Sequence, residues 1–326
     1  MPPVPPIKAS QDKKPEKPEV PEKLRPYVFH KMSLNVPASG EAQGTCPFCG
    51  SNKFYVSPVN GLFDCKSCPE EGNVYTFLRS LHMHSVEATN AKDLAMIAEE
   101  RGISVDGLAG IGLCFSIIDR ELLLPTWGFP TVKDGKIYSP FTGLYRWTKM
   151  KQGDGSWKRR LLVTATLQHG LFGLHDWDDA KPDVYIQEGP WDMEALRDEL
   201  KQYKVVDNEL EECSLNESFY ATANVVGTPG CDVFRDEWIS KFRHKNVFIG
   251  MDNDHPTRYK DGHAKAGEFV RHKDGSKTVA GFDGMKKLAR LLYPVAKSVQ
   301  IMNWGPEGYD EELPSGHDTR DFLSQA

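Results

Sequence analysis

Residues 184–192 read VYIQEGPWD and residues 247–254 read VFIGMDND, two short apolar runs that each lead into acidic side chains. An apolar run of this length, bounded by glycine, is typical of a buried strand. Pro190 fits the first turn of a helix that would follow the first of these strands. The two stretches therefore predict strands whose carboxyl ends carry carboxylates.

The chain from residue 181 onward alternates predicted strands with predicted helices. We expect strands at 184–187, 223–226, 247–250 and 297–302, and helices at 191–203, 232–242 and 282–292. This alternation implies a parallel sheet with helices on its faces, and ligands bind at the carboxyl edge of such a sheet. We expect acidic side chains to converge there from separate strand ends. They are Glu188, Asp192, Asp252, Asp254, Asp318 and Asp321.

Converging carboxylates favour a divalent-metal site. Hard oxygen ligands suit Mg²⁺ or Mn²⁺, which keep several waters and bind substrate phosphates. Two such ions can activate an attacking hydroxyl and stabilise a departing pyrophosphate. Asp-x-Asp and Glu-Gly are also common pairs in loops, so the prediction depends on their occurring in this order, each after a strand.

Two pairs of cysteines, Cys46-x2-Cys49 and Cys65-x2-Cys68, are separated by fifteen residues. Each pair offers two converging thiolates, and a hairpin between the pairs would complete a tetrahedral zinc site. Four protein ligands leave no open position, so we expect a structural or recognition zinc. The aromatic residues of this hairpin either form the core of the domain, which we favour, or stack on exposed bases. They are Phe48, Phe54, Tyr55 and Phe63.

A β-rich segment at residues 122–180 contains a concentrated positive charge. Within it, residues 131–160 hold eight Lys or Arg and two Asp, although the whole chain has a net charge of -6. Glycine turns predict antiparallel strands here, and a local basic surface suits a polyanion. The candidate ligands of a nucleotide or of DNA are Arg146, Lys149, Lys151, Lys158, Arg159 and Arg160.

These features predict five successive parts in a mixed α+β and α/β chain. Residues 1–27 are rich in proline and charge and predict a disordered tail. A small zinc-binding ribbon follows at 28–85, and a helical linker at 86–121. The basic β-rich subdomain at 122–180 then precedes the parallel α/β subdomain at 181–326.

Length and composition narrow the classes of protein. The chain has 326 residues, of which 39% are hydrophobic and 26% are charged, so it can bury more than one core. No stretch approaches the roughly 18 consecutive apolar residues of a membrane span, and the first residues lack the apolar region of a signal peptide. We therefore expect a cytoplasmic protein with no membrane partner.

The motifs at 184–192 and 249–254 together resemble the Toprim domain. A four-cysteine ribbon upstream, with a basic β-rich segment between, resembles DnaG-type primases. Residues 171–177, LFGLHDW, are similar to the primase half of phage primase-helicases. The resemblance spans roughly residues 44–323 and implies a zinc ribbon, a mixed-sheet basic subdomain and a Toprim subdomain, in a bacterium or a phage-infected cell.

The resemblance implies a primase, a DNA-directed RNA polymerase that makes short RNA primers on single-stranded DNA from ribonucleoside triphosphates. Its implied catalytic and Mg²⁺ or Mn²⁺ residues are Glu188, Asp252 and Asp254, with Asp192, Asp318 and Asp321 at secondary acidic positions. The sequence has no G-x-x-x-x-G-K-[ST] phosphate loop, so a separate replicative helicase is expected. Three alternatives remain: a RecR-type recombination mediator that only binds DNA, a Toprim nuclease, and a topoisomerase. The topoisomerase is the least favoured, because it needs a tyrosine nucleophile on a larger clamp than this length allows.

The sequence departs from the Toprim pattern after Asp254. In the family an Ala-Gly pair and a helix follow the Asp-x-Asp almost at once, whereas here Ala280-Gly281 and Ala266-Gly267 are rival matches. The first match leaves an insertion of about 255–279 with six Lys or Arg. Such an insertion either grips nucleic acid or is a solvated loop.

Overall fold

The chain folds as two units, Met1–Val74 and Tyr75–Ala326. The structure, a computed structural model, describes residues 20–151, 155–163, 170–206, 209–230 and 233–324, so residues 1–19 of the predicted tail at 1–27 lie outside it. Within these ranges no helix is long and apolar enough to cross a membrane. The predicted fold class is confirmed, because a cysteine-rich ribbon precedes a larger part with antiparallel and parallel sheets.

The first unit is built on one antiparallel sheet in the order β1-β2-β3-β4-β5. The strands are β1 (Leu34–Asn35), β2 (Ala42–Gly44), β3 (Phe54–Val56), β4 (Phe63–Cys65) and β5 (Glu71–Gly72). Phe54 and Phe63 are 0% and 3% exposed, and their rings stack at 5.4 Å. The favoured role of these two aromatic residues, as core, is the one that the structure shows.

A short helical segment also belongs to the first unit. It comprises η1 (Glu22–Leu24) and α1 (Arg25–Phe29). Leu24 and Tyr27 are fully buried, and the Tyr27 hydroxyl donates to the Gly61 carbonyl at 2.6 Å. The predicted tail at 1–27 is therefore too long, because apolar side chains near its end are buried against the ribbon.

The second unit contains the predicted parallel sheet, in the order β15-β12-β16-β17. Its strands are β12 (Asp183–Glu188), β15 (Ala223–Thr228), β16 (Asn246–Ile249) and β17 (Ser298–Ile301). Neighbouring residues of β12 belong to different hydrophobic clusters. Ile186 packs with the buried face of α6 (Ala280–Leu292), and Tyr185 packs with the buried face of α5 (Gly189–Gln202). Helices therefore cover both faces of the sheet, as the sequence predicts.

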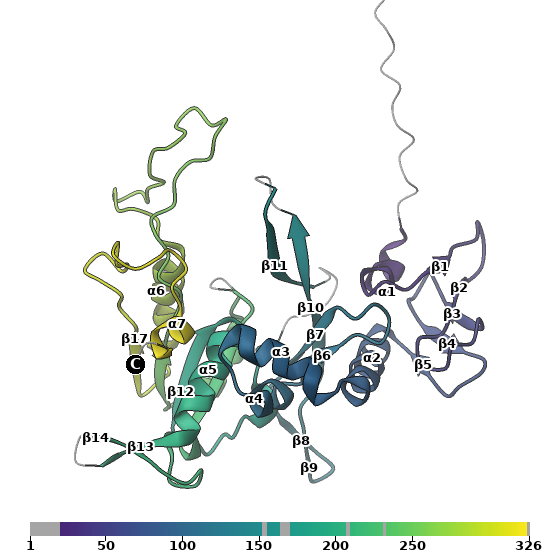
Figure 1. The fold of residues 1–326 in the computed structure, drawn as a ribbon, viewed down its shortest axis with the longest axis horizontal. Coiled ribbons are helices and arrows are strands. Elements are labelled where there is room, and N and C mark those ends of the chain that lie inside the picture. Colours follow the sequence, from purple (N-terminus) through teal and green to yellow (C-terminus); the bar gives the residue numbers. More distant parts are fainter. Residues whose placement is uncertain (1–19, 152–154, 164–169, 207–208, 231–232, 325–326) are drawn as a thin grey trace, which may run out of the picture. The chain divides into compact units, whose positions relative to one another are not determined.

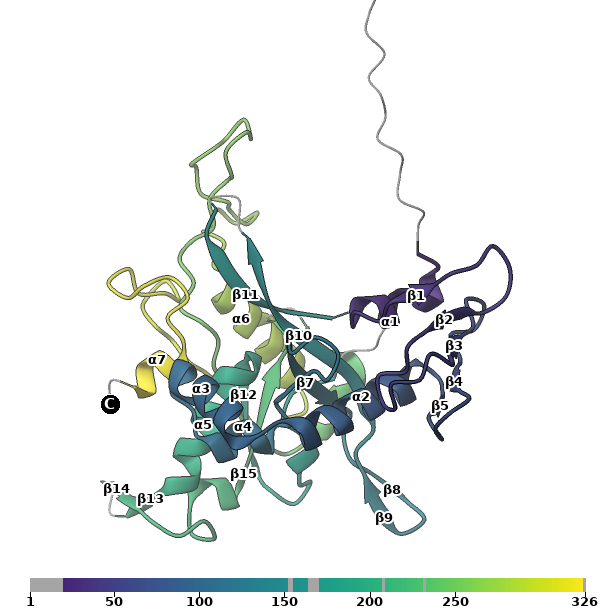
Figure 2. The ribbon, with the colours of Figure 1, turned by 45° about the vertical axis from the view of Figure 1, so that its right-hand side comes forward.

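The basic segment forms a second, antiparallel sheet in the order β11-β10-β7-β6. Its strands are β6 (Cys114–Phe115), β7 (Leu122–Trp127), β10 (Phe141–Lys151) and β11 (Trp157–Leu162). In two views the β10–β11 hairpin projects to the same side of the second unit as the extended loop between β16 and α6 (Figure 1, Figure 2). Smaller hairpins are formed by β8 (Thr131–Lys133) with β9 (Lys136–Tyr138) and by β13 (Tyr203–Val206) with β14 (Glu209–Glu212).

The predicted helical linker at 86–121 is instead part of the core of the second unit. It contains the end of α2 (Val74–Ala88), all of α3 (Ala91–Arg101) and α4 (Val105–Gly110), and the strand β6. Leu94, Ile97 and Leu108 are buried in one cluster with Met193 of α5. Helices of a linker would not bury one side in this way. The apolar spacing of α3 and α4 therefore indicates that they pack in the core of the second unit.

The remaining helical elements are short. The predicted helix at 232–242 is a 3-10 helix, η4 (Asp236–Phe242), and still buries Trp238 and Phe242 against the sheet. The others are η2 (Leu174–Asp176), η3 (Phe219–Ala221) and α7 (Thr319–Leu323). The four-residue spacing of Trp238 and Phe242 suits an α-helix, whereas a 3-10 helix has three residues per turn, so this spacing did not predict the tighter helix.

Candidate metal and nucleotide site

The four cysteine sulfurs of the first unit lie in the geometry of a zinc site. All four Sγ atoms are within 4.8 Å of one another, with Cys46 to Cys68 at 3.8 Å and Cys49 to Cys65 at 3.7 Å. Sulfurs bound at about 2.3 Å around a tetrahedral zinc would be about 3.8 Å apart. Donor chemistry and spacing therefore both fit Zn²⁺, and the four-thiolate shell leaves no position for a substrate.

The order of the parallel sheet brings two acidic segments side by side. β12 pairs with β15 on one side and with β16 on the other, so the direction of sheet growth reverses between β12 and β16. Parallel α/β sheets bind ligands at this switch point, outside the carboxyl ends of the strands. Glu188 ends β12, and Asp252 and Asp254 follow β16, in which Ile249 pairs with Ile186.

The carboxylates at this edge perturb one another. Burial raises the pKa of Asp252 to about 9, and the charges of Glu188, Asp192, Asp318 and Asp254 add to the rise. Burial, followed by the charge of Asp318, raises the pKa of Asp192 to about 8. Carboxylates in such a partly buried group ionise together only when a cation balances their charge. The donor set therefore fits Mg²⁺ or Mn²⁺ in its chemistry.

The spacing of these acids suits a hydrated ion. Among the described residues only the cysteine cluster places three or more ligand atoms within 4.8 Å of one another. The carboxylates of Glu188, Asp252 and Asp254 are therefore more open than a closed protein cage. Mg²⁺ characteristically binds through one or two carboxylates and keeps several waters.

Asp318 and Asp321 stand at the start of α7 and differ in what they contact. The Asp318 carboxylate accepts from the Asp321 backbone at 2.8 Å, and the Asp321 carboxylate accepts from the Asp318 backbone at 3.3 Å. The Arg320 backbone donates to Asp192 at 3.2 Å. Both residues thus form the helix cap, but the charge of Asp318 also raises the pKa of Asp192 and of Asp252, so Asp318 joins the acidic group and Asp321 is left out of the proposed metal site.

Asn253 holds the acidic loop in place, and the sequence analysis missed it. Its side chain is fully buried, accepts from the Asp310 backbone at 2.8 Å and donates to the carbonyls of Asp310 at 3.0 Å and Pro314 at 3.3 Å. Its backbone pairs with His317. Residue 253 therefore ties the 252–254 segment to the loop that leads to Asp318. In the sequence, only its position between Asp252 and Asp254 pointed to a role for Asn253.

The chain returns to the acidic edge at Gly281, in the first turn of α6. The Gly281 backbone donates to the Asp254 carboxylate at 2.9 Å, and a Cβ at Gly281 would lie 2.4 Å from the Asp252 carbonyl oxygen. No side chain fits at that distance. Ala280-Gly281 is thus the pair beside the acids, whereas Ala266 and Gly267 are exposed within the insertion at 255–279.

The predicted basic ligands occupy both faces of the β10–β11 hairpin. Lys149 pairs with Arg159 and Lys151 with Trp157 on one face, whereas Lys158 and Arg160 lie on the other. Lys149, Lys151 and Lys158 make no ion pair with any described residue, and Trp157 is 66% exposed. Two cations and an exposed indole therefore share the first face with Arg159.

Arg146 differs from the other basic candidates. It is 2% exposed, and its guanidinium forms a two-pronged ion pair with Asp119, at 2.5 Å and 3.4 Å. A buried and paired guanidinium does not reach a ligand in solvent. The prediction that Arg146 binds nucleotide or DNA therefore does not fit the structure, and its position predicts a structural ion pair.

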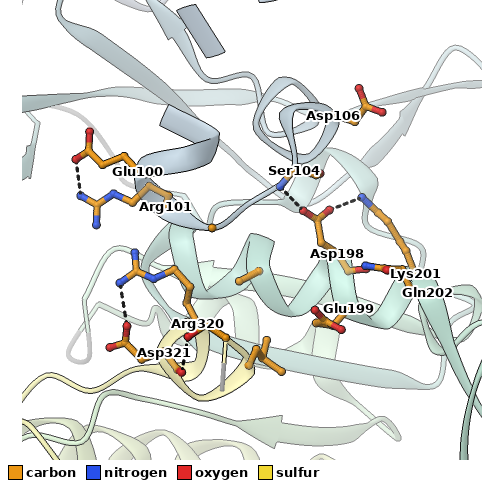
Figure 3. A pocket seen from close by; sticks show the side chains of 14 residues that line it. Glu100, Arg101, Ser104, Asp106, Asp198, Glu199, Lys201, Gln202, Arg320 and Asp321 are labelled. Carbon is orange, nitrogen blue, oxygen red and sulfur yellow. Dashed lines mark hydrogen bonds and ion pairs between the residues drawn. The ribbon is translucent and has the colours of Figure 1, made fainter. Parts of the chain in front are cut away.

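A pocket of about 640 Å³ lies between α3, α4, α5 and α7, close to the acidic group. Figure 3 shows Arg101 and Arg320 extending to the same side of this pocket. Burial lowers the pKa of Arg101, and the positive charges of Arg320 and Arg159 lower it further. The guanidinium groups of Arg101 and Arg159 lie over the Trp147 ring, at 4.3 Å and 4.5 Å.

The three guanidinium groups are each paired with a carboxylate: Arg320 with Asp318 at 2.9 Å, and Arg101 and Arg159 with Glu100 at 4.0 Å and 3.9 Å. An anion with several oxygens would have to displace these partners, in return for charge-assisted hydrogen bonds to the guanidinium groups. The Nε of Arg101 is buried and has no hydrogen-bond partner among the described residues. No local pattern singled out Arg101 or Arg320, because they belong to helices far apart in the chain.

Comparison with known proteins finds similarity at the level of structure alone. No protein-family profile and no curated protein sequence matches the chain. The zinc-binding and RNA polymerase domains of the Aquifex aeolicus primase align over 93% of this chain and 80% of that one, with 16% identity and a TM-score of 0.42. The primase fragment of the bacteriophage T7 primase-helicase aligns over 86% and 93%, with 15% identity and a TM-score of 0.35. The DnaG catalytic core aligns over 77% and 74%, with 17% identity and a TM-score of 0.43.

Proposed function

We propose that this chain is a DNA primase, which joins ribonucleotides on a single-stranded DNA template by metal-dependent nucleotidyl transfer. The observation that supports the proposal is the parallel pairing of β12 with β16, after which Glu188 and the segment with Asp252 and Asp254 follow neighbouring strand ends at the switch point. Arg101 and Arg320, which line the neighbouring pocket, support a triphosphate substrate. The Toprim-like motifs and the cysteine ribbon support the choice of primase among enzymes that act on triphosphates.

In the proposed reaction the 3′-hydroxyl oxygen of one nucleotide attacks the α-phosphorus of the next. The bond between this phosphorus and the pyrophosphate oxygen breaks, and the hydroxyl proton passes to water. Glu188, Asp252 and Asp254 would hold Mg²⁺ or Mn²⁺, which lowers the pKa of the hydroxyl and stabilises the charge on pyrophosphate. Arg101 and Arg320 would bind the triphosphate oxygens and fix the α-phosphorus in line with its attacker.

The template would lie on basic surfaces outside this centre. Lys149, Lys151 and Lys158 are exposed and would contact phosphates, which fixes the strand without reading its sequence. The exposed Trp157 ring offers a surface for one base. The zinc unit would contact the start site on the template. A separate replicative helicase would unwind the duplex, in a bacterial cytoplasm or a phage-infected cell.

Primer synthesis tests the proposal. The full chain is incubated with single-stranded templates, labelled ribonucleotides and Mg²⁺ or Mn²⁺, and short RNA products are expected. Glu188→Gln keeps the size of the side chain and removes its charge, so it should abolish synthesis and spare DNA binding. Glu209→Gln, on the exposed strand β14, serves as the matched control and should synthesise normally.

Two outcomes would contradict the proposal in different ways. Binding of DNA without synthesis on any template would favour a recombination mediator, because such a protein needs no nucleotidyl transfer. Cleavage of DNA in Mn²⁺ that is lost in Glu188→Gln would favour a nuclease, because the same acids would then activate water.

A further inference from the structure

The insertion at 255–279, here called the arm, has no part in the function proposed above. It leaves the acidic edge directly after Asp254 and returns at Ala280, where α6 begins. It carries six Lys or Arg against three Asp or Glu, within a chain whose net charge is -6. The arm therefore carries a net positive charge although it starts and ends at an acidic site, and the proposed function does not explain this charge.

The arm is an ordered structure. The Thr257 and Thr278 backbones bond at 2.9 Å, and Val270 bonds to both, at 2.8 Å and 2.9 Å. At its base, the Lys277 ammonium donates to Glu307 at 3.1 Å, and the His272 ring lies 2.8 Å from the Asp283 carboxylate. These contacts fix the base of the arm to α6 and to the loop after β17.

Apart from Lys277 at its base, the cations of the arm divide into two groups. Arg258 and Arg271 donate to carbonyls within the arm, at 2.8 Å and 2.7 Å, and so maintain its shape. Lys260, Lys265 and Lys273 are exposed, and none forms an ion pair with a described residue. Three charges are therefore presented to solvent on a structured support.

Aromatic rings lie among these charges. Tyr259 and His263 stack at 4.4 Å with an angle of 8° between their planes, and the Arg258 guanidinium lies 3.7 Å from the centre of the Phe269 ring. Tyr259, Lys265 and Phe269 help to line a pocket of about 400 Å³. Small ligands occupy pockets of roughly 300–1,000 Å³. The space is thus adequate for part of a nucleotide.

We infer that the arm binds single-stranded nucleic acid, with its free lysines on phosphates and a base against Tyr259. Cations that follow a backbone, together with aromatic rings, are the means by which proteins bind single strands without sequence preference. The arm also projects to the same side of the second unit as the basic β10–β11 hairpin (Figure 1, Figure 2). The identity of the strand, template or new primer, rests on the proposed function.

The experiment is a salt titration of DNA binding by the full chain. Fluorescence anisotropy with a labelled single-stranded oligonucleotide, without Mg²⁺ or Mn²⁺, gives the dissociation constant from low to moderate salt. The test variant is Lys260→Ala with Lys265→Ala and Lys273→Ala. The control is a variant with three exposed cations changed elsewhere in the second unit. These are Lys92→Ala, Arg243→Ala and Lys297→Ala.

Loss of three phosphate contacts should reduce the slope of log affinity against log salt by about 2 and weaken binding by up to roughly 100-fold at 0.1 M salt. The control should change the slope by much less. A second variant, Tyr259→Ala, should weaken binding roughly tenfold and leave the slope unchanged, because stacking releases no counterions. All variants should keep the thermal stability of the parent.

The inference is overturned if the lysine variant has the same affinity and slope as the control. The arm would then be a solvated loop or a contact for a protein. Unchanged affinity for Tyr259→Ala overturns the stacking contact. Binding is measured without synthesis, so failure of the proposed primase activity would leave this result intact, and failure here would leave the primer assay intact.

Discussion

Replacing Asp252 by asparagine should stabilise the second unit when no divalent cation is present, although it should destroy catalysis. The pKa of this carboxyl rises from 3.8 to about 9 on folding, first through burial and then through Glu188 and its other acidic neighbours. Between these values the native state binds one more proton than the unfolded state. The free energy of unfolding therefore falls as pH rises, by about 1.4 kcal/mol per pH unit for this group.

From pH 6 to pH 8 the expected loss from Asp252 alone is roughly 3 kcal/mol. Asp192, whose pKa is raised to about 8, adds its own pH dependence in both proteins, and because its charge acts on Asp252, the difference between them reports Asp252 together with this coupling. Asparagine does not ionise, and its amide is close in size to the protonated acid. The variant should therefore be more stable than wild type at pH 8 and less different from it at pH 6.

Urea unfolding followed by tryptophan fluorescence measures this difference. All seven tryptophans lie after residue 75, so the signal reports the second unit alone. The buffer omits Mg²⁺ and Mn²⁺ but contains no chelator, because a chelator would remove zinc and unfold the first unit. Asp261→Asn, at an exposed carboxylate in the arm, is the matched control and should follow wild type.

Addition of Mn²⁺ supplies the second part of the test. At one hundred times its dissociation constant, a cation that binds only the native state stabilises it by about 2.7 kcal/mol. Wild type should gain this stability most strongly at pH 8, and Asp252→Asn should gain little. The reasoning fails if the variant shows the same pH dependence as wild type, or if Mn²⁺ stabilises both proteins equally.

Three further perturbations have defined outcomes. Cys65→Ser should release zinc, as measured by a colorimetric metal assay, and unfold the ribbon. The unfolding of the second unit, followed by tryptophan fluorescence, should stay unchanged. Retained zinc would disprove the four-thiolate site. Asn253→Ala should lower the free energy of unfolding by roughly 2–4 kcal/mol, because it leaves the Asp310 amide and two carbonyls unpaired. It should also reduce primer synthesis by displacing Asp318. A loss below about 0.5 kcal/mol would show that water replaces these bonds. Trp157→Ala should weaken single-stranded DNA binding roughly tenfold and Trp157→Phe much less, measured by anisotropy; equal effects would exclude stacking.

Local sequence patterns determined which segments form strands and helices and which reactive side chains stand at their ends. Two apolar runs followed by acids correctly predicted neighbouring parallel strands, because a buried strand needs a continuous apolar run and a parallel sheet aligns all carboxyl ends at one edge. The cysteine spacing predicted the zinc site for a similar reason. Both signals depend on residues close together in the chain, where backbone geometry alone fixes the relation.

Tertiary structure alone decided which charged residues are available. Arg146 stands on the same basic strand as Lys149, yet it meets Asp119 and is buried, whereas Lys149 meets solvent. Arg101 and Arg320 lie more than two hundred residues apart and still share one pocket. The charge of a side chain is set by its type, but its partner depends on distances across the fold, which no local pattern contains.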